Sequence, residues 1–204
     1  MSVKTSPPNG AAEAVISRHP AYISHLLHDT IQQGDSVEVA YPFGEFFIDN
    51  FTSPVVFLSA GVGLTPLLAM FNTLTTVEGK PPTRQIRWIQ GMRTPRDHAF
   101  LQHIRSMAQK YPDQIKTAIF YSRLIEGDQL QNGDYKGRMN LFREDFDKGL
   151  LHLDDKESQY YICGPVAFMD GTKDKDGTKK DGIKDQLKQL GVGDDRVHSE
   201  VFVP

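Results

Sequence analysis

The sequence predicts an α/β protein: a parallel sheet flanked by helices on both faces, preceded by a smaller β-rich segment. Short, continuously apolar runs recur along the chain, as in strands that are buried on both faces. Segments with apolar residues at helical spacing separate these runs. Two of the runs also end in glycine-bearing turns that open a helix. Such strand–helix alternation favours parallel pairing, with helices packed on both sides of the sheet.

The first 52 residues differ from the remainder. Val37, Val39 and Tyr41 alternate with polar residues, which predicts a half-buried strand, and residues 45–48 are expected to form its neighbour. A short helix is expected around residues 20–27. We therefore predict two domains, a β-rich fragment over residues 1–52 and an α/β domain over residues 53–204.

The α/β part is expected to begin with a strand at residues 55–58 and a helix at residues 65–78. Asp97 is placed to cap a second helix that runs to about residue 110. Further strands are predicted at residues 86–90, 116–121, 159–163 and 197–202.

Composition excludes several classes of protein. The 204 residues carry 23 Lys and Arg against 26 Asp and Glu, so a strongly basic nucleic-acid binder is not expected. The single cysteine, Cys163, excludes an intrachain disulfide and a multi-cysteine metal site, and the histidines show no metal-ligand spacing. No apolar run approaches the roughly 18 residues of a membrane span. We expect a cytoplasmic protein with no metal and no membrane partner.

The strongest motif is the turn at residues 59–66, SAGVGLTP, which follows a buried strand. Gly61 and Gly63 allow the backbone to approach a ligand closely. Thr65 is placed to cap the next helix, and Pro66 suits its first position. With Ser59 at the end of the strand, this turn predicts an anion site suited to a pyrophosphate. An ordinary tight strand-to-helix turn remains the alternative.

A second turn of the same kind ends the run YYICGP at residues 160–165. Gly164 forms the turn and Pro165 stands at a helix start. Both turns would lie at the carboxyl ends of sheet strands, where α/β sheets bind ligands. Cys163 is then either beside a ligand or a small buried apolar residue.

The segments SAGVGLTPLLAM and YYICGPVAFM, together with the terminal Glu-Val-Phe at residues 200–202, resemble the NAD(P)-binding domain of the ferredoxin–NADP reductase superfamily. The similarity is closest to the reductase portion of flavohaemoglobins, the nitric oxide dioxygenases. This resemblance implies a ferredoxin-reductase-type α/β domain, an N-terminal fragment of a β-barrel, and NAD(P)H as cofactor.

The resemblance also implies roles for the two turns. Gly61, Gly63 and Thr65 would hold the pyrophosphate of NAD(P)H, and residues 163–165 would flank its nicotinamide. Glu200 would lie near the site of hydride transfer.

Other implied roles concern the flavin and the adenosine end of the dinucleotide. Phe202 would cover the flavin ring, and Ser24 matches a serine that contacts the flavin pyrophosphate. Ser122 and Arg123 resemble the pair that reads the 2′-phosphate of NADPH, a task suited to the fork geometry of a guanidinium. A solvated loop cation is the equal alternative for Arg123.

The chain departs from that family in having no globin, only the last half of the flavin barrel, and no Arg-x-Tyr-Ser flavin anchor. FAD binding is therefore left open. Three functions remain: an oxidoreductase module that passes hydride from NAD(P)H to a flavin or another acceptor, a nucleotide-binding module without redox chemistry, and a small-molecule catalyst that uses the flavin cleft. The expected partners are a small-molecule substrate or electron acceptor, with a second copy or a missing domain completing the site.

One polar segment fits none of these elements. Residues 170–181 read DGTKDKDGTKKD, a near-duplication of a six-residue unit, and predict an exposed loop before helix resumes near residues 183–190. A calcium loop is excluded, because Thr172 and Ile183 would stand where carboxylates are required.

Overall fold

The computed structural model describes residues 3–4, 25–41, 44–49, 52–75, 82–173 and 175–202. The chain divides into two compact units, one formed by Met1–Glu45 with Pro204 and the other by Phe46–Val203. Each unit is described by itself. The domain boundary expected near residue 52 stays a prediction.

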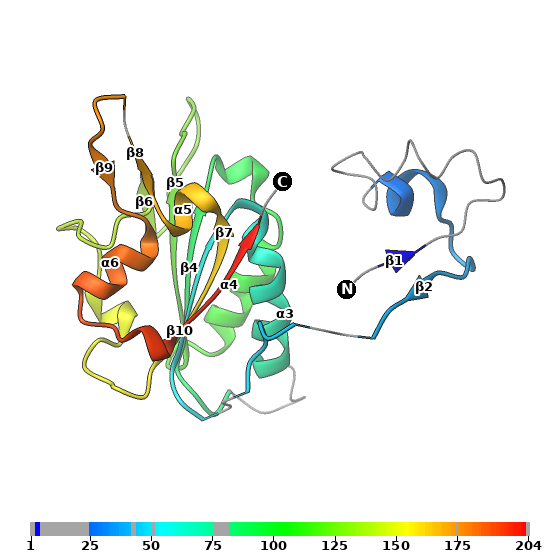
Figure 1. The fold of residues 1–204 in the computed structure, drawn as a ribbon, viewed down its shortest axis with the longest axis horizontal. Coiled ribbons are helices and arrows are strands. Elements are labelled where there is room, and N and C mark those ends of the chain that lie inside the picture. Colours follow the sequence, from blue (N-terminus) through cyan, green and yellow to red (C-terminus); the bar gives the residue numbers. More distant parts are fainter. Residues whose placement is uncertain are drawn as a thin grey trace. The chain divides into compact units, whose positions relative to one another are not determined.

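The larger unit contains a six-stranded sheet in which every neighbouring pair of strands is parallel (Figure 1). The strand order is β10-β7-β3-β4-β5-β6. Five of these strands were predicted from their apolar runs; β6 was not. The strands are β3 (Val55–Ala60), β4 (Ile86–Met92), β5 (Ile115–Tyr121), β6 (Asp134–Lys136), β7 (Gln159–Pro165) and β10 (Val197–Phe202).

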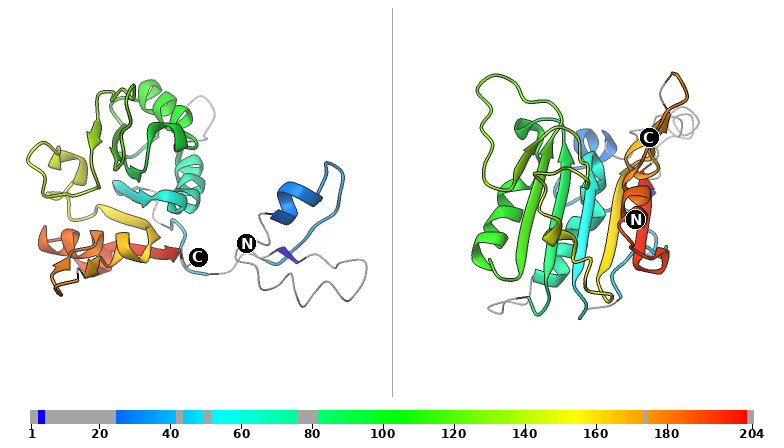
Figure 2. Two further views of the ribbon diagram at one scale, coloured as in Figure 1. Left: turned by 90° about the horizontal axis from the view of Figure 1, so that it is seen from above. Right: turned by 90° about the vertical axis from the view of Figure 1, so that its left-hand side faces the viewer.

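Helices cover both faces of the sheet, as predicted (Figure 2). Successive strand residues point to opposite faces, so β3 supplies apolar side chains to two cores. Phe57 packs with Phe71 and Ile104 on one face, and Leu58 packs with Leu187 on the other. The first face carries α3 (Leu64–Thr75) and α4 (Leu101–Lys110), and the second carries α5 (Val166–Met169) and α6 (Ile183–Gln189).

Several short elements complete the described chain. They are the strands β1 (Val3–Lys4), β2 (Glu38–Val39), β8 (Thr172–Lys173) and β9 (Lys179–Lys180), the π-helix η1 (Leu26–Thr30), and the 3₁₀ turns η2 (Gly61–Gly63), η3 (Pro95–Asp97), η4 (Lys148–Leu151) and η5 (Asp194–Arg196). No helix among the described residues is both long and apolar enough to cross a membrane.

A buried polar network joins the ends of β4 and β5. The Gln90 side-chain oxygen accepts from Trp88 Nε1 at 2.8 Å and lies 2.9 Å from His98 Nε2. Because that oxygen can only accept, His98 Nε2 carries the proton, and His98 Nδ1 accepts from the Tyr121 hydroxyl at 3.0 Å. Burial lowers the pKa of His98 to about 4 and raises that of Tyr121 to about 12, so both are neutral at pH 7.

The edge strand β6 is held by an ion pair. Arg105 of α4 donates to the Asp134 carboxylate at 2.6 Å, with only 3% of the Asp134 side chain exposed. The same carboxylate accepts from the Gln131 backbone amide at 2.9 Å. These contacts add to the packing of Tyr135, the central residue of β6, whose ring stacks on Phe120 at 4.7 Å between centroids.

Asp97 and residues 45–48 do not have the structure that the sequence predicts for them. Asp97 lies in η3 instead of capping α4, whose N-cap is Phe100 with a left-handed φ of 61°. Residues 45–48 form no strand. They cover the core instead, with Ile48 buried and Phe46 packed against Tyr161 at 6.1 Å between ring centroids.

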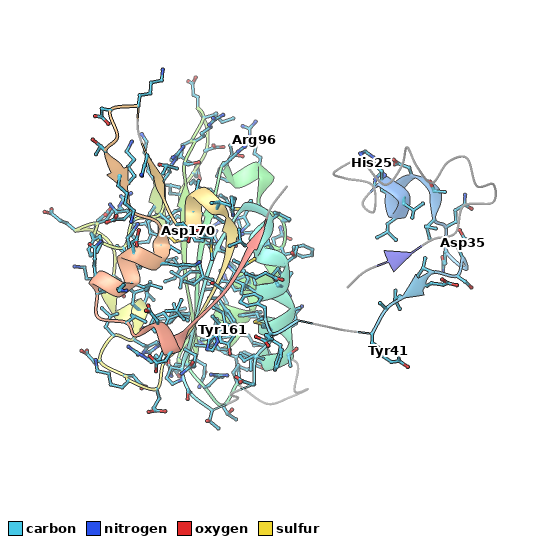
Figure 3. All side chains as sticks on the ribbon, in the orientation of Figure 1. His25, Asp35, Tyr41, Arg96, Tyr161 and Asp170 are labelled. Carbon is cyan, nitrogen blue, oxygen red and sulfur yellow. The ribbon has the colours of Figure 1, made fainter. Side chains whose placement is uncertain are left out.

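The smaller unit contains little regular structure among its described residues. The strand expected around Val37, Val39 and Tyr41 shrinks to β2, which pairs antiparallel with β1 over two residues. All three side chains are exposed, Tyr41 by 93%, and Figure 3 shows the Tyr41 ring projecting from the chain. The predicted burial is therefore wrong. A two-residue ladder has no second layer to cover it, and no closed barrel forms in the described residues. The helix expected at residues 20–27 is described only from His25 onward.

Candidate functional site

The two glycine turns touch each other. A Cβ added to Gly63 would lie 2.2 Å from the Cys163 carbonyl oxygen and 2.6 Å from the Gly164 nitrogen. A Cβ added to Gly164 would lie 2.7 Å from the Phe168 ring and 3.3 Å from the Ala60 backbone. Glycine is required at both positions because backbone packs directly on backbone. The turn after β3 is thus locked to the last residues of β7, which extends through the predicted glycine turn to Pro165.

The first turn enters its helix differently from the prediction. Gly61, at φ 55°, starts the 3₁₀ turn η2, and α3 then begins at Leu64. Thr65 is therefore already inside the helix, and its hydroxyl donates to the Val62 carbonyl at 3.1 Å. The expected N-cap role of Thr65 is wrong, because the preceding 3₁₀ turn has already made the chain helical. Pro66 lies in the first turn of α3, as expected.

The contact between the turns lies where the order of strands reverses. Strands β4 to β6 are added on one side of β3, and β7 and β10 are added on the other. Strands β3 and β7 are neighbours, yet α3 and α5, which follow them, lie on opposite faces. In open parallel sheets this switch point forms a crevice outside the carboxyl ends of the strands, where ligands bind. Both predicted turns therefore meet at the location where a ligand is expected.

A cavity of about 1090 Å³ opens at this edge of the sheet. It reaches from the two turns across the ends of β4 and β5 to the segment that follows β6. Its volume suits a large ligand, since pockets for small molecules and cofactors span roughly 300–1,000 Å³. The lining residues are Ala60, Gly61, Gly91, Met92, Arg93, Phe120, Ser122, Arg138, Met139, Asn140, Phe142, Pro165, Ala167, Phe168, Gly171, Thr172, Lys180, Asp181, Ile183 and Gln186.

The charge of this lining favours an anion. Arg93, Arg138 and Lys180 are basic, and Asp181 is the one acidic residue among the described lining residues. The Asp181 carboxylate is already engaged, accepting from Gln189 Nε2 at 2.7 Å. Two touching glycine turns, three cations and apolar walls together fit a dinucleotide, which carries phosphates between flat rings.

Gln186 of α6 ties two walls of the cavity together. Its side-chain oxygen accepts from the buried Leu141 amide at 2.8 Å, and its side-chain nitrogen donates to the Asp181 carbonyl at 3.3 Å. Leu141 belongs to the segment after β6, whereas Asp181 follows the β8–β9 hairpin. The cavity is therefore braced across its floor.

Cys163 lies at the end of β7, fully buried, with Glu200 of β10 in register beside it. Burial and, to a lesser extent, the Glu200 charge raise the pKa of the Cys163 thiol to about 11. The thiol is therefore protonated at pH 7 and is not an activated nucleophile. Phe202 is in register with Pro165; its side chain lies outside the described residues.

The predicted site residues fall into three groups. Gly61, Ser122 and Pro165 line the cavity. Seven others lie in the same turns or beside them without lining it: Ser59, Gly63, Thr65, Pro66, Cys163, Gly164 and Glu200. The buried Ser59 hydroxyl has no hydrogen-bond partner among the described residues.

Three predicted residues remain, and Phe202, whose backbone is in register with Pro165, is one of them. Arg123 is exposed and is not among the lining residues; its backbone amide donates to the Arg93 carbonyl at 2.8 Å. Ser24 lies outside the described residues.

Sequence reasoning missed the three basic residues of the cavity. Arg93 directly follows β4, so the strand-end rule used for the two turns would also have found it. Arg138 follows the unpredicted strand β6, and Lys180 lies in the segment taken for a loop. Among the described residues, no group of three or more His, Cys, Asp and Glu side chains is placed to hold a metal ion.

Comparison with known proteins agrees with this geometry. The sequence profile of the oxidoreductase NAD-binding domain matches residues 57–174. Flavohemoproteins from Rhizobium meliloti and Bordetella pertussis are both 36% identical to the chain, over 91% and 88% of its length. The chain spans only about two fifths of these relatives, 41% and 40%.

Solved structures give the same fold. The flavohem-like FAD/NAD binding domain of nitric oxide dioxygenase from Vibrio cholerae matches with a TM-score of 0.64 and 28% identity, covering 89% of this chain and 65% of that one. The cytochrome b5 reductase domain of Ulva prolifera nitrate reductase matches with a TM-score of 0.67 at 19% identity, covering 90% and 67%. The latter likeness concerns the fold alone.

Proposed function

Because the chain belongs to the oxidoreductase NAD-binding domain family, we propose that this NAD(P)H-binding module passes hydride from the dinucleotide in its cavity to a flavin or another acceptor. The observation that carries the proposal is the cavity itself. It joins the two touching glycine turns to three basic residues at the carboxyl edge of one parallel sheet. That arrangement suits an elongated, doubly charged ligand.

The pyrophosphate would lie at the first turn. Gly61 lines the cavity and carries no side chain to keep a phosphate from its backbone. Gly63 acts indirectly, since its contact with Cys163 fixes the position of the turn. Thr65 and Pro66 extend the turn into α3, whose amino-terminal end favours negative charge.

The adenosine end would lie across β4 and β5. Ser122 and Arg93 line that part of the cavity, and Arg138 approaches from the segment after β6. These guanidinium groups are suited to bind phosphate in a fork. Phe142, 40% exposed in the same lining, offers a flat apolar surface for the adenine ring. The Arg123 side chain is not part of the cavity lining, so it would contact the 2′-phosphate only by extending into the cavity from outside that lining.

The nicotinamide end would lie against Pro165 at the second turn, beside Cys163 and Glu200. When bound, the dinucleotide supplies a hydride. The buried, protonated Cys163 thiol would support the turn from within the core without touching the ring, and Glu200, on the edge strand beside it, would set the local charge. Phe202 and Ser24 would serve the flavin, as the family resemblance implies.

The hydride acceptor would bind at a site that this chain forms only in part. The chain spans about two fifths of its flavohemoprotein relatives, so a second polypeptide, a second copy or a further domain would complete a flavin site. We expect the module to act in the cytoplasm, where its single buried cysteine stays reduced.

Anaerobic mixing of the purified chain with NADPH and FAD tests hydride transfer directly. We expect bleaching of the flavin absorbance faster than in a protein-free control, and a smaller acceleration with a Gly63→Ala variant at NADPH concentrations below saturation. If the chain binds NADPH but never accelerates flavin reduction, a nucleotide-binding module without redox chemistry is the better description. A chain that binds neither points to a recruited pocket for another small molecule.

A further inference from the structure

We propose that the β8–β9 hairpin is a phosphate-binding wall of the nucleotide cavity and that Lys180 contacts the bound dinucleotide, an inference that rests on the proposed function. The hairpin corresponds to the repeated DGTK segment expected to be an exposed loop. Thr172 pairs with Lys180 and Lys173 with Lys179 in an antiparallel ladder. Figure 1 shows it rising beyond the end of the sheet toward which the β10 arrow points.

The base of the hairpin is pinched by two glycines. A Cβ added to Gly171 would lie 2.0 Å from the Lys180 carbonyl oxygen and 2.6 Å from the Gly182 nitrogen. A Cβ added to Gly182 would lie 2.3 Å from the Met169 carbonyl oxygen. The chain therefore leaves α5 and returns to α6 at nearly the same point. This close contact fixes where the hairpin stands.

The hairpin is also braced on its outer side. Lys179 donates to the Asp185 carboxylate of α6 at 2.5 Å, and Lys184 of α6 donates to Asp170 at 3.1 Å. Asp170 is labelled in Figure 3 next to α5 and α6. On the inner side, Gln186 bonds both the Asp181 carbonyl and the opposite wall. The hairpin base is thus part of the cavity scaffold.

The hairpin and the Arg138 segment reach the cavity from two sides. Arg138 follows β6, whereas the hairpin follows β7 and α5, and β3, β4 and β5 lie between those strands in the sheet. Thr172, Lys180 and Arg138 all line the same cavity. Lys180 therefore adds a positive charge to the wall that the hairpin forms, separate from the wall that carries Arg138. A phosphate of the ligand is the complementary group.

Titration of NADPH and NADH into wild-type, Lys180→Ala and Lys173→Ala proteins tests this, with energy transfer from the single tryptophan, Trp88, or calorimetry as readout. Lys173 is the matched control because it lies in the same ladder, is exposed and is absent from the lining. We expect Lys180→Ala to bind about fivefold more weakly, with a shallower salt dependence, and Lys173→Ala to bind like wild type. Equal weakening for both dinucleotides assigns Lys180 to the pyrophosphate, and weakening for NADPH alone assigns it to the 2′-phosphate.

A second variant removes residues 172–181 and joins Gly171 to Gly182, whose backbones are already adjacent. We expect it to fold and to lose at least as much affinity as Lys180→Ala. Wild-type affinity in Lys180→Ala, or equal losses in Lys180→Ala and Lys173→Ala, would overturn the assignment while leaving the proposed function intact. Failure of the wild-type chain to bind either dinucleotide would overturn both.

Discussion

Replacing Gly63 with alanine places a methyl group against the backbone of Cys163. The added carbon would lie 2.2 Å from the carbonyl oxygen and 2.4 Å from the carbonyl carbon, whereas ordinary contact begins near 3.4 Å. Relief requires the two turns to separate by roughly 1 Å, because both partners are main chain and cannot rotate away. Overpacking of this kind costs about 1–3 kcal/mol of the free energy of unfolding.

The same displacement moves the turn away from the ligand position. A loss of about tenfold in NADPH affinity, near 1.4 kcal/mol, is the expected result. Gly127→Ala is the matched control. Gly127 has a left-handed φ of 88° with nothing within 4 Å of an added Cβ, and it lies outside the cavity lining. It should cost about 1 kcal/mol through backbone strain and leave affinity unchanged.

Urea denaturation measures the stability of both variants, and calorimetry measures their NADPH affinity. Gly63→Ala should also lower the melting temperature by roughly 4–10 °C, given the size of the chain. If Gly63→Ala matched wild type in both stability and affinity, the contact between the turns would not be what positions the site.

Three further predictions concern buried groups. His98 has a pKa of about 4 in the fold against 6.5 for a solvent-exposed histidine, so the unfolded chain binds more protons between these values. Stability should fall by about 3 kcal/mol as pH drops from 6.5 to 4, and a His98→Gln variant should lose that part of the pH profile in urea titrations. Asp134→Ala leaves Arg105 without its carboxylate, so unfolding free energy should fall by about 3 kcal/mol, while Arg105→Met with Asp134→Leu should recover part of that loss. The buried, protonated Cys163 should react with a thiol reagent at pH 8 only as fast as the protein unfolds, and rapid labelling of the folded chain would contradict its placement.

The strands that sequence reasoning found are those whose own residues carry the signal. In β3, Val55, Val56, Phe57 and Leu58 are each at most 1% exposed, so an unbroken apolar run was enough to predict a strand buried on both faces. The edge strand β6 has only three residues, none of them fully buried, and it is held by Asp134 through a partner 29 positions away. No local sequence pattern predicts such a strand.

The predicted helix starts were wrong because they also depend on residues outside the local pattern. Asp97 is a good capping residue by type, but α4 starts after Phe100, whose left-handed conformation depends on the surrounding packing. Thr65 is likewise a good cap by type, yet η2 begins the helical path earlier. Tyr41 fits an alternating strand pattern, although its burial depends on a layer that the described part of its unit does not contain.

The residues of the candidate site also fall into those that the sequence predicted and those that it did not. Gly61 and Pro165 were predicted from glycine-bearing turns at strand ends, which meet at one edge of a parallel sheet, and Ser122 was predicted from the family resemblance. Arg138 and Lys180 reach that edge only through β6 and the glycine-pinched hairpin. Their convergence is a property of the assembled sheet, which spacing along the chain does not encode.

Equilibrium titration of NADPH into the purified wild-type chain is the most direct test of the central claim, that the cavity at the carboxyl edge of the sheet binds a nicotinamide dinucleotide. We expect saturable binding of one dinucleotide per chain with a dissociation constant below about 1 mM, weakened by salt and by Gly63→Ala. Absence of saturable binding at that concentration, or binding that Gly63→Ala leaves unchanged in a folded protein, would contradict it.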